Sequence, residues 1–250
     1  MPAARPKQPG LPEGPIEPFD LACACYLYET MTDYAGSLDR LRSKVGRALD
    51  LSQEEHRLAL LKFLNDWGVR GLAKDWHWLA SEVLDSWYGS AQDSLRLLDG
   101  SRAELEATRL SDLARVFDSL STRIAAKRIR DGREMLVSFG PTATSKTLFA
   151  LMPNILLAWD GPMRKAFGHD GDGESYAEFV KGIHRKVAET KLRFASRGFD
   201  LEQLPAKLGR PAYTTLNQLI IEYYWITITR GVSLPRKSTV REWLTWCDRD

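Results

Sequence analysis

The chain has 250 residues, of which 44% are hydrophobic and 27% charged, a composition typical of a globular protein with a large core. The 35 basic and 33 acidic side chains nearly balance, so affinity for a polyanion would require cations gathered on one face. The three cysteines lack the spacing of a zinc knuckle, and no apolar run matches a membrane span or a secretory signal. These features predict a cytoplasmic protein, a monomer, with no metal, no cofactor and no membrane partner.

The N-terminal segment differs in composition from the rest of the chain. Residues 1–18 are rich in proline and glycine, and we expect them to form a disordered tail. We expect residues 19–250 to form a single all-α domain. Two lobes with a cleft near 140–165 are an alternative arrangement of the same helices.

From residue 19 onward the hydrophobic periodicity is helical almost everywhere. A capping box at 52–55 opens a first helix, a tryptophan-rich helix over 76–89 follows, and 110–130 predicts one amphipathic helix. Two further helices are expected over 175–197 and 213–230, although the second ends in β-branched residues that favour a helix less. The sequence thus predicts an all-α fold of about nine to eleven helices, without a strand of convincing length.

The most informative stretch of the chain lies between residues 139 and 165. A Gly-Pro turn at 140–141 leads into an apolar helix that carries Lys146, Pro153 ends this helix, and Asp160 opens the next one. An aspartate before a Gly-Pro pair is typical of a helix N-cap, where the helix dipole keeps a carboxylate ionised. A lysine that points into an apolar cleft becomes a nucleophile because burial lowers its pKa, whereas a lysine in solvent stays protonated.

Residues 136–168 resemble the core of the helix-hairpin-helix DNA glycosylases. The resemblance implies that Lys146 attacks the sugar C1′ and that Asp160 supports the oxocarbenium-like centre. The implied activity is removal of a modified or damaged base from double-stranded DNA, with strand cleavage through a Schiff base. It would serve base-excision repair or antiviral defence. The family's hairpin carries two glycines, and here the second position is Thr142.

The same resemblance implies where the DNA lies. Gly140, Thr142, Thr144 and Ser145 are expected to contact phosphates through backbone N–H groups and hydroxyls. Trp159, next to Asp160, is expected to hold the extruded base. A basic cluster just before the turn would extend the positive track: Arg123, Lys127, Arg128 and Arg130.

Two other functions remain open from the sequence. The helices would form a non-catalytic DNA- or protein-binding module if Lys146 and Asp160 face opposite sides. Arg164 and His169 have the R-x4-H spacing of the all-α HEPN ribonucleases, in which histidine acts as acid or base. The glycines around His169 predict a loop there instead of that family's helix.

Overall fold

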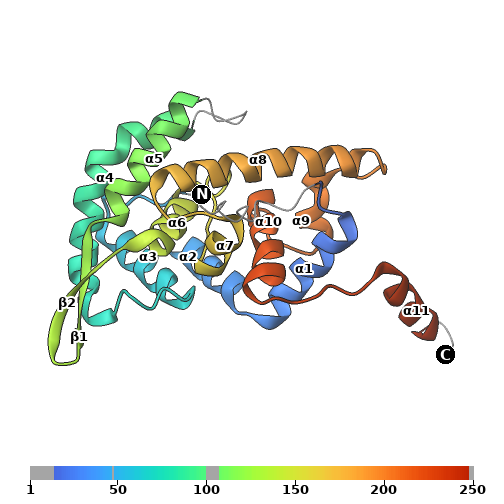
Figure 1. The fold of residues 1–250 in the computed structure, drawn as a ribbon, viewed down its shortest axis with the longest axis horizontal. Coiled ribbons are helices and arrows are strands. Elements are labelled where there is room, and N and C mark those ends of the chain that lie inside the picture. The colour runs from blue at the N-terminus through green and yellow to red at the C-terminus, as the bar shows by residue number, and fades with distance from the viewer. Residues whose placement is uncertain (1–13, 47, 100–106, 248–250) are drawn as a thin grey trace, which may run out of the picture.

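The computed structural model describes residues 14–46, 48–99 and 107–247, and helices make up most of this part of the chain (Figure 1). The predicted all-α fold is confirmed. The α-helices are, in chain order, α1 (Pro18–Met31), α2 (Tyr34–Val45), α3 (Glu54–Asp66), α4 (His77–Asp99), α5 (Ala107–Ser121), α6 (Gly140–Leu151), α7 (Gly161–Phe167), α8 (Gly173–Ala195), α9 (Leu204–Lys207), α10 (Leu216–Tyr224) and α11 (Lys237–Cys247).

Three shorter helical turns complete the helical part of the fold. Two are 3-10 turns, η1 (Lys74–Trp76) and η2 (Leu201–Gln203). The third, η3 (Trp225–Thr229), continues α10 as a π-helix. Within the described ranges, no helix combines the length and the apolar character that a membrane crossing requires.

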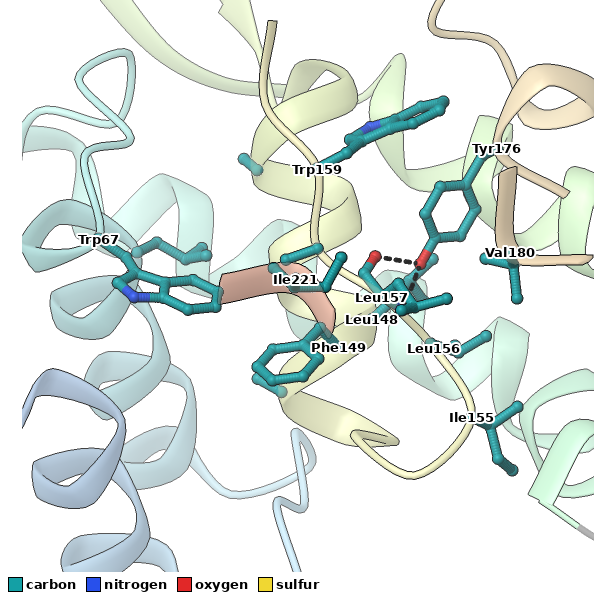
Figure 2. Close-up of a cluster of buried hydrophobic side chains, with 14 of the residues drawn as sticks. Trp67, Leu148, Phe149, Ile155, Leu156, Leu157, Trp159, Tyr176, Val180 and Ile221 are labelled. Carbon is teal, nitrogen blue, oxygen red and sulfur yellow. Dashed lines mark hydrogen bonds between the residues drawn. The ribbon is translucent and has the colours of Figure 1, made fainter. Parts of the chain in front are cut away.

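Helix α6 lies at the centre of the molecule, and seven of its twelve residues are buried. It packs against α3 and α5. Figure 2 shows Leu148 and Phe149 of α6 within a cluster of buried side chains. The ring of Trp67, just after α3, stacks on Phe149 with 5.4 Å between ring centroids. The lysine-bearing helix is therefore held rigidly by the core.

The long helix α8 lies along one side of the molecule and packs against α5 (Figure 1). Asp172 caps α8 by accepting a hydrogen bond from the backbone N–H of Ser175. Gly173 permits the close approach of the two helices, because a Cβ atom there would lie 2.1 Å from the carbonyl oxygen of Ala114. Its N–H donates to the carboxylate of Asp118 at 2.7 Å.

The described residues before α1 are attached to α8. Ile16 is buried, and its N–H donates to the hydroxyl of Thr190 at 3.2 Å. Glu17 forms ion pairs with Arg193 and Arg197, each at 2.8 Å. The disordered tail predicted for 1–18 is therefore wrong for residues 14–18, and residues 1–13 lie outside the described part.

The single long helix predicted over 110–130 is wrong. Helix α5 ends at Ser121, and two antiparallel strands follow, β1 (Ile124–Arg130) and β2 (Arg133–Ser138). Asp131 and Gly132 join them with φ angles of 52° and 72°, the left-handed backbone of a tight hairpin turn. Strand β2 therefore leads almost directly into α6, and the Gly-Pro pair at 140–141 begins this helix instead of forming a turn between two helices.

Candidate functional site

Lys146 projects from the middle of α6 and is partly buried. Its ammonium group donates a hydrogen bond to the carbonyl oxygen of Trp67 and lies 5.2 Å from the centroid of that indole ring. Burial lowers the pKa of Lys146 to about 8, and the negative charge of Asp160 opposes this shift. Near neutral pH about a tenth or more of such a lysine is a neutral amine, far more than at an ordinary pKa. Lys146 thus loses its proton more readily than an exposed lysine does.

Asp160 is fixed by two independent donors. As the N-cap of α7, its Oδ1 accepts a hydrogen bond from the N–H of Met163 at 2.9 Å. The hydroxyl of Thr229, the last residue of η3, lies 3.0 Å from Oδ1 and 2.8 Å from Oδ2. The hydroxyl has one proton to share between the two oxygens, so it holds the plane of the carboxylate in place.

Lys146 and Asp160 line the same pocket. Both belong to the described part of the chain, and no direct ion pair joins them, although their charges interact. The pocket holds about 20 Å³, room for little more than one water molecule. Its walls come from six elements, from Trp67 just after α3 and from the segment before α7: Tyr28, Tyr34, Trp67, Lys146, Ala158, Trp159, Asp160, Met163, Ile221 and Trp225.

Aromatic side chains form one wall of this pocket. Tyr34 lies edge-on to Trp225 at 5.5 Å and to Trp67 at 6.4 Å between ring centroids. Tyr28 also meets Trp225 edge-on, at 5.4 Å. Tyr34 and Trp225 are partly exposed, whereas Tyr28 and Trp67 are buried. The two exposed rings therefore lie at the mouth of the pocket.

Trp159, which was expected to hold the base, lines the pocket but is held in the core. Its ring is 1% exposed, its Nε1 donates to the carbonyl of Pro141, and it packs edge-on against Phe117 and Tyr176. Figure 2 shows Trp159 beside Tyr176, away from Trp67. Trp159 thus lines the pocket from a buried position, and its role in holding a base stays a prediction.

The four residues predicted to contact phosphates differ in how deeply they are buried. Thr144 and Ser145 are fully buried, so neither hydroxyl can reach DNA. The hydroxyl of Ser145 accepts from the N–H of Trp159 at 3.2 Å and lies 3.2 Å from its carbonyl, which ties α6 to the segment before α7. Gly140 and Thr142 are partly exposed at the start of α6, so their predicted role remains a prediction.

The basic cluster predicted on a helix lies around the β-hairpin. Lys127 forms an ion pair with Glu134 at 2.9 Å and lies over the ring of Trp76. Arg128 is exposed. Arg123 precedes β1 and donates to the hydroxyl of Ser86. The side chain of Arg130 lies outside the described part of the structure.

Sequence reasoning missed most of the pocket wall. Tyr28 and Tyr34 come from the consecutive helices α1 and α2, but Trp67 and Trp225 lie far from them in the chain, and no motif links the four rings. Thr229 was also missed, although the sequence around it indicated an irregular helix. The β-branched residues 226–229 fit an α-helix poorly, and the structure contains a π-helix there, with the N–H of Arg230 donating to the carbonyl of Trp225.

The ribonuclease alternative gains no support from the structure. His169 follows the α7 cap in a loop, as predicted. Its ring packs on the buried rings of Trp159 and Phe179, and burial lowers its pKa. It lines neither of the two described pockets.

A larger groove of about 650 Å³ lies between α8, α9 and the start of α10. Its cations already have acidic partners, since Lys181 pairs with Glu178 and Lys191 with Glu202. His184, also in the groove, is hydrogen-bonded to the carbonyl of Ile155 at 2.7 Å. Among the described residues, no three His, Cys, Asp or Glu side chains are grouped so that they could hold a metal ion.

Comparison with known proteins gives no relative: no family model matches the chain, and neither a curated protein nor a solved structure is significantly similar to it.

Proposed function

We propose that the chain is a DNA glycosylase with lyase activity, acting on a modified or damaged base. One observation carries the proposal: a lysine with a lowered pKa and a carboxylate fixed by two donors line the same aromatic pocket. A non-catalytic binding module has no need of such a pairing. Desolvated lysines and oriented carboxylates are common at sites of covalent catalysis.

In the proposed reaction the neutral amine of Lys146 attacks C1′ of the extruded nucleotide. The glycosidic bond breaks, its electron pair leaves with the base, and the base takes up a proton. Positive charge develops on the sugar, and the carboxylate of Asp160 stabilises it electrostatically. Loss of a proton from nitrogen and opening of the sugar ring give a Schiff base. Removal of a C2′ proton then expels the 3′ phosphate and cleaves the strand.

The aromatic wall of the pocket is suited to a planar ligand. Extruded bases are held by stacking between aromatic or apolar side chains. Since the pocket has room for little more than one water molecule, a base can enter only when the mouth opens. Tyr34 and Trp225 are the partly exposed rings there, and Trp225 begins a π-helix, an irregularity common at functional sites.

The proposal is tested by base release. The protein is incubated with duplexes that carry damaged or hypermodified bases, and alkali then reveals abasic sites. We expect release from at least one substrate and its loss in Asp160→Asn, which removes the charge while keeping an N-cap residue. Asp170→Asn, at an exposed position, is the matched control. No release from any substrate, or full release by Asp160→Asn, would contradict the proposal.

The alternative, a non-catalytic DNA-binding module, makes a different prediction. Salt-sensitive DNA binding would then survive the loss of both Lys146 and Asp160, and no base would be released.

A further inference from the structure

The β1–β2 hairpin is anchored at its base and exposed toward its tip, where it projects from the edge of the molecule (Figure 1). Ala125 and Ala126 are fully buried against the body, whereas Ile129 is 81% exposed. A two-stranded ribbon has little stability of its own, so its base depends on these contacts with the body. The exposed isoleucine near the tip contributes nothing to that anchoring.

One face of the hairpin carries unpaired arginines. In the strand register Arg128 lies opposite Met135, and Arg133 precedes Met135 by two residues, so all three share a face. Arg128 and Arg133 are exposed, and within the described residues neither has an ion-pair partner. Their charges are therefore available to an anion outside the molecule.

The other face carries two exposed aliphatic side chains beside an ion pair. Ile129 lies opposite Glu134, and Leu136, which is 61% exposed, lies opposite Lys127. The ion pair between Lys127 and Glu134 neutralises the charges on this face. The hairpin thus combines free cations on one face with exposed aliphatic side chains on the other.

We propose that the β1–β2 hairpin is an arm that enters a groove of double-stranded DNA. Arg128 and Arg133 contact phosphates, and Ile129 packs against the sugars and base edges. Residues 124–138 contain four basic and two acidic side chains, so the arm is complementary to a polyanion. Arginine combined with an inserted aliphatic side chain is a known way to bind and open a DNA groove.

The base of the arm lies close to residues of the candidate site in the chain. Strand β2 leads directly into α6, which carries Lys146. Val137 of β2 also packs near Gly71, where a Cβ atom would lie 3.5 Å from its side chain, in the loop that follows Trp67. DNA gripped by the arm would run past this side of the molecule. The choice of DNA as partner rests on the proposed function, but the arm itself requires no modified base.

The test is binding of a short, unmodified DNA duplex, measured by fluorescence anisotropy over a range of salt concentrations. For Arg128→Ala/Arg133→Ala we expect the slope of log affinity against log salt to fall by about two, and affinity to fall more than tenfold near 0.1 M salt. The matched control is Arg96→Ala/Arg185→Ala, which removes two exposed arginines from α4 and α8. An unchanged slope in the hairpin variant would overturn the proposal.

Ile129→Ser tests the apolar contact separately. It removes apolar burial and no charge, so affinity should fall about five- to tenfold while the salt slope stays constant. Leu192→Ser, at a position on α8 that is 74% exposed, is the control. Wild-type affinity in Ile129→Ser would overturn the groove placement.

Failure of the arm and failure of the glycosylase proposal can be told apart. The duplex of the binding test carries no modified base, so its affinity reports the arm and not base release. If no substrate loses a base and the hairpin variants still lose DNA affinity, the arm stands without the enzyme.

Discussion

At the residue scale, two opposing effects set the chemistry of Lys146. Burial favours the neutral amine, and the carboxylate of Asp160 favours the ammonium form. The balance leaves the pKa at about 8, so the ammonium form that donates to the Trp67 carbonyl coexists near neutral pH with the neutral amine that the proposed reaction requires.

The pKa of Lys146 can be measured without a substrate. After reductive methylation with ¹³C-formaldehyde, one dimethyl-lysine resonance should titrate with a midpoint of about 8 and should disappear in Lys146→Met. In Asp160→Asn the midpoint should move to lower pH, because the charge that raises the pKa is gone. A midpoint that stays constant in Asp160→Asn would show that the two groups do not interact.

Thr229 is expected to position Asp160. Thr229→Val removes the hydroxyl that bonds both carboxylate oxygens, so the single-turnover rate of base release should fall about tenfold, the effect of one lost charge-assisted hydrogen bond. Thr229→Ser keeps the hydroxyl and should restore the rate. If Thr229→Val and Thr229→Ser lose the same amount of activity, the loss comes from packing at this position and not from the hydrogen bond.

Lys146 and Asp160 could be predicted from the sequence because each lies in a recognisable local pattern, an apolar helix and a helix N-cap. The direction of a side chain could not be predicted. Trp159 and Ser145 lie beside these residues in the chain, yet both turn into the core. The rings that form the pocket wall are brought together only by tertiary packing.

At the element scale, the segment 152–160 connects the two helices of the site, and Ser145 fixes it to α6. Ser145→Ala leaves the N–H and carbonyl of Trp159 without this partner. The free energy of unfolding should therefore fall by about 1–3 kcal/mol in urea denaturation. Thr142→Ala, at a partly exposed position of the same helix, should change it little. Equal stability of the two variants would contradict the structural role of Ser145.

The β-hairpin shows why one element was mispredicted. The apolar periodicity of α5 continues through Ile124 and the helix-forming Ala125 and Ala126, so a local pattern favours one longer helix. The Asp131–Gly132 turn was the signal for a hairpin. The flanking strands alternate only weakly because both faces are exposed near the tip, which removes the usual contrast between apolar and polar sides.

At the scale of the whole molecule, a buried ion pair joins elements from both ends of the chain. Arg210 donates to Glu222 of α10 at 2.9 Å and to the carbonyl of Cys25 in α1 at 2.8 Å. Gln218 also donates to Glu222 at 3.1 Å. Burial raises the pKa of Glu222 to about 7, and the charge of Arg210 opposes this shift.

Removing one partner of this pair should cost more than removing both. Glu222→Gln leaves the buried charge of Arg210 with Glu29 as its ion-pair partner, at 3.4 Å, so we expect a loss of about 3 kcal/mol or less in urea denaturation. Arg210→Met/Glu222→Leu removes both charges and should be less destabilised than the single variant. A double variant that is less stable than Glu222→Gln would contradict this account of the pair.

The all-α class of the molecule could be predicted because helical periodicity runs through most of the chain. The convergence of α1, α2, α6, α7, α10 and η3 on one pocket could not be predicted, since no local signal specifies which helices pack together. That convergence turns Lys146 from an ordinary helix residue into a candidate nucleophile.

The most direct test of the central claim is covalent trapping. The protein is incubated with the duplex from which it releases a base, in the presence of borohydride, which reduces a Schiff base to a stable adduct. We expect a protein–DNA adduct whose yield rises with pH through about 8, the pKa of Lys146, and which is absent in Lys146→Ala. Base release without any trapped adduct, or an undiminished adduct in Lys146→Ala, would contradict the assignment of Lys146 as the nucleophile.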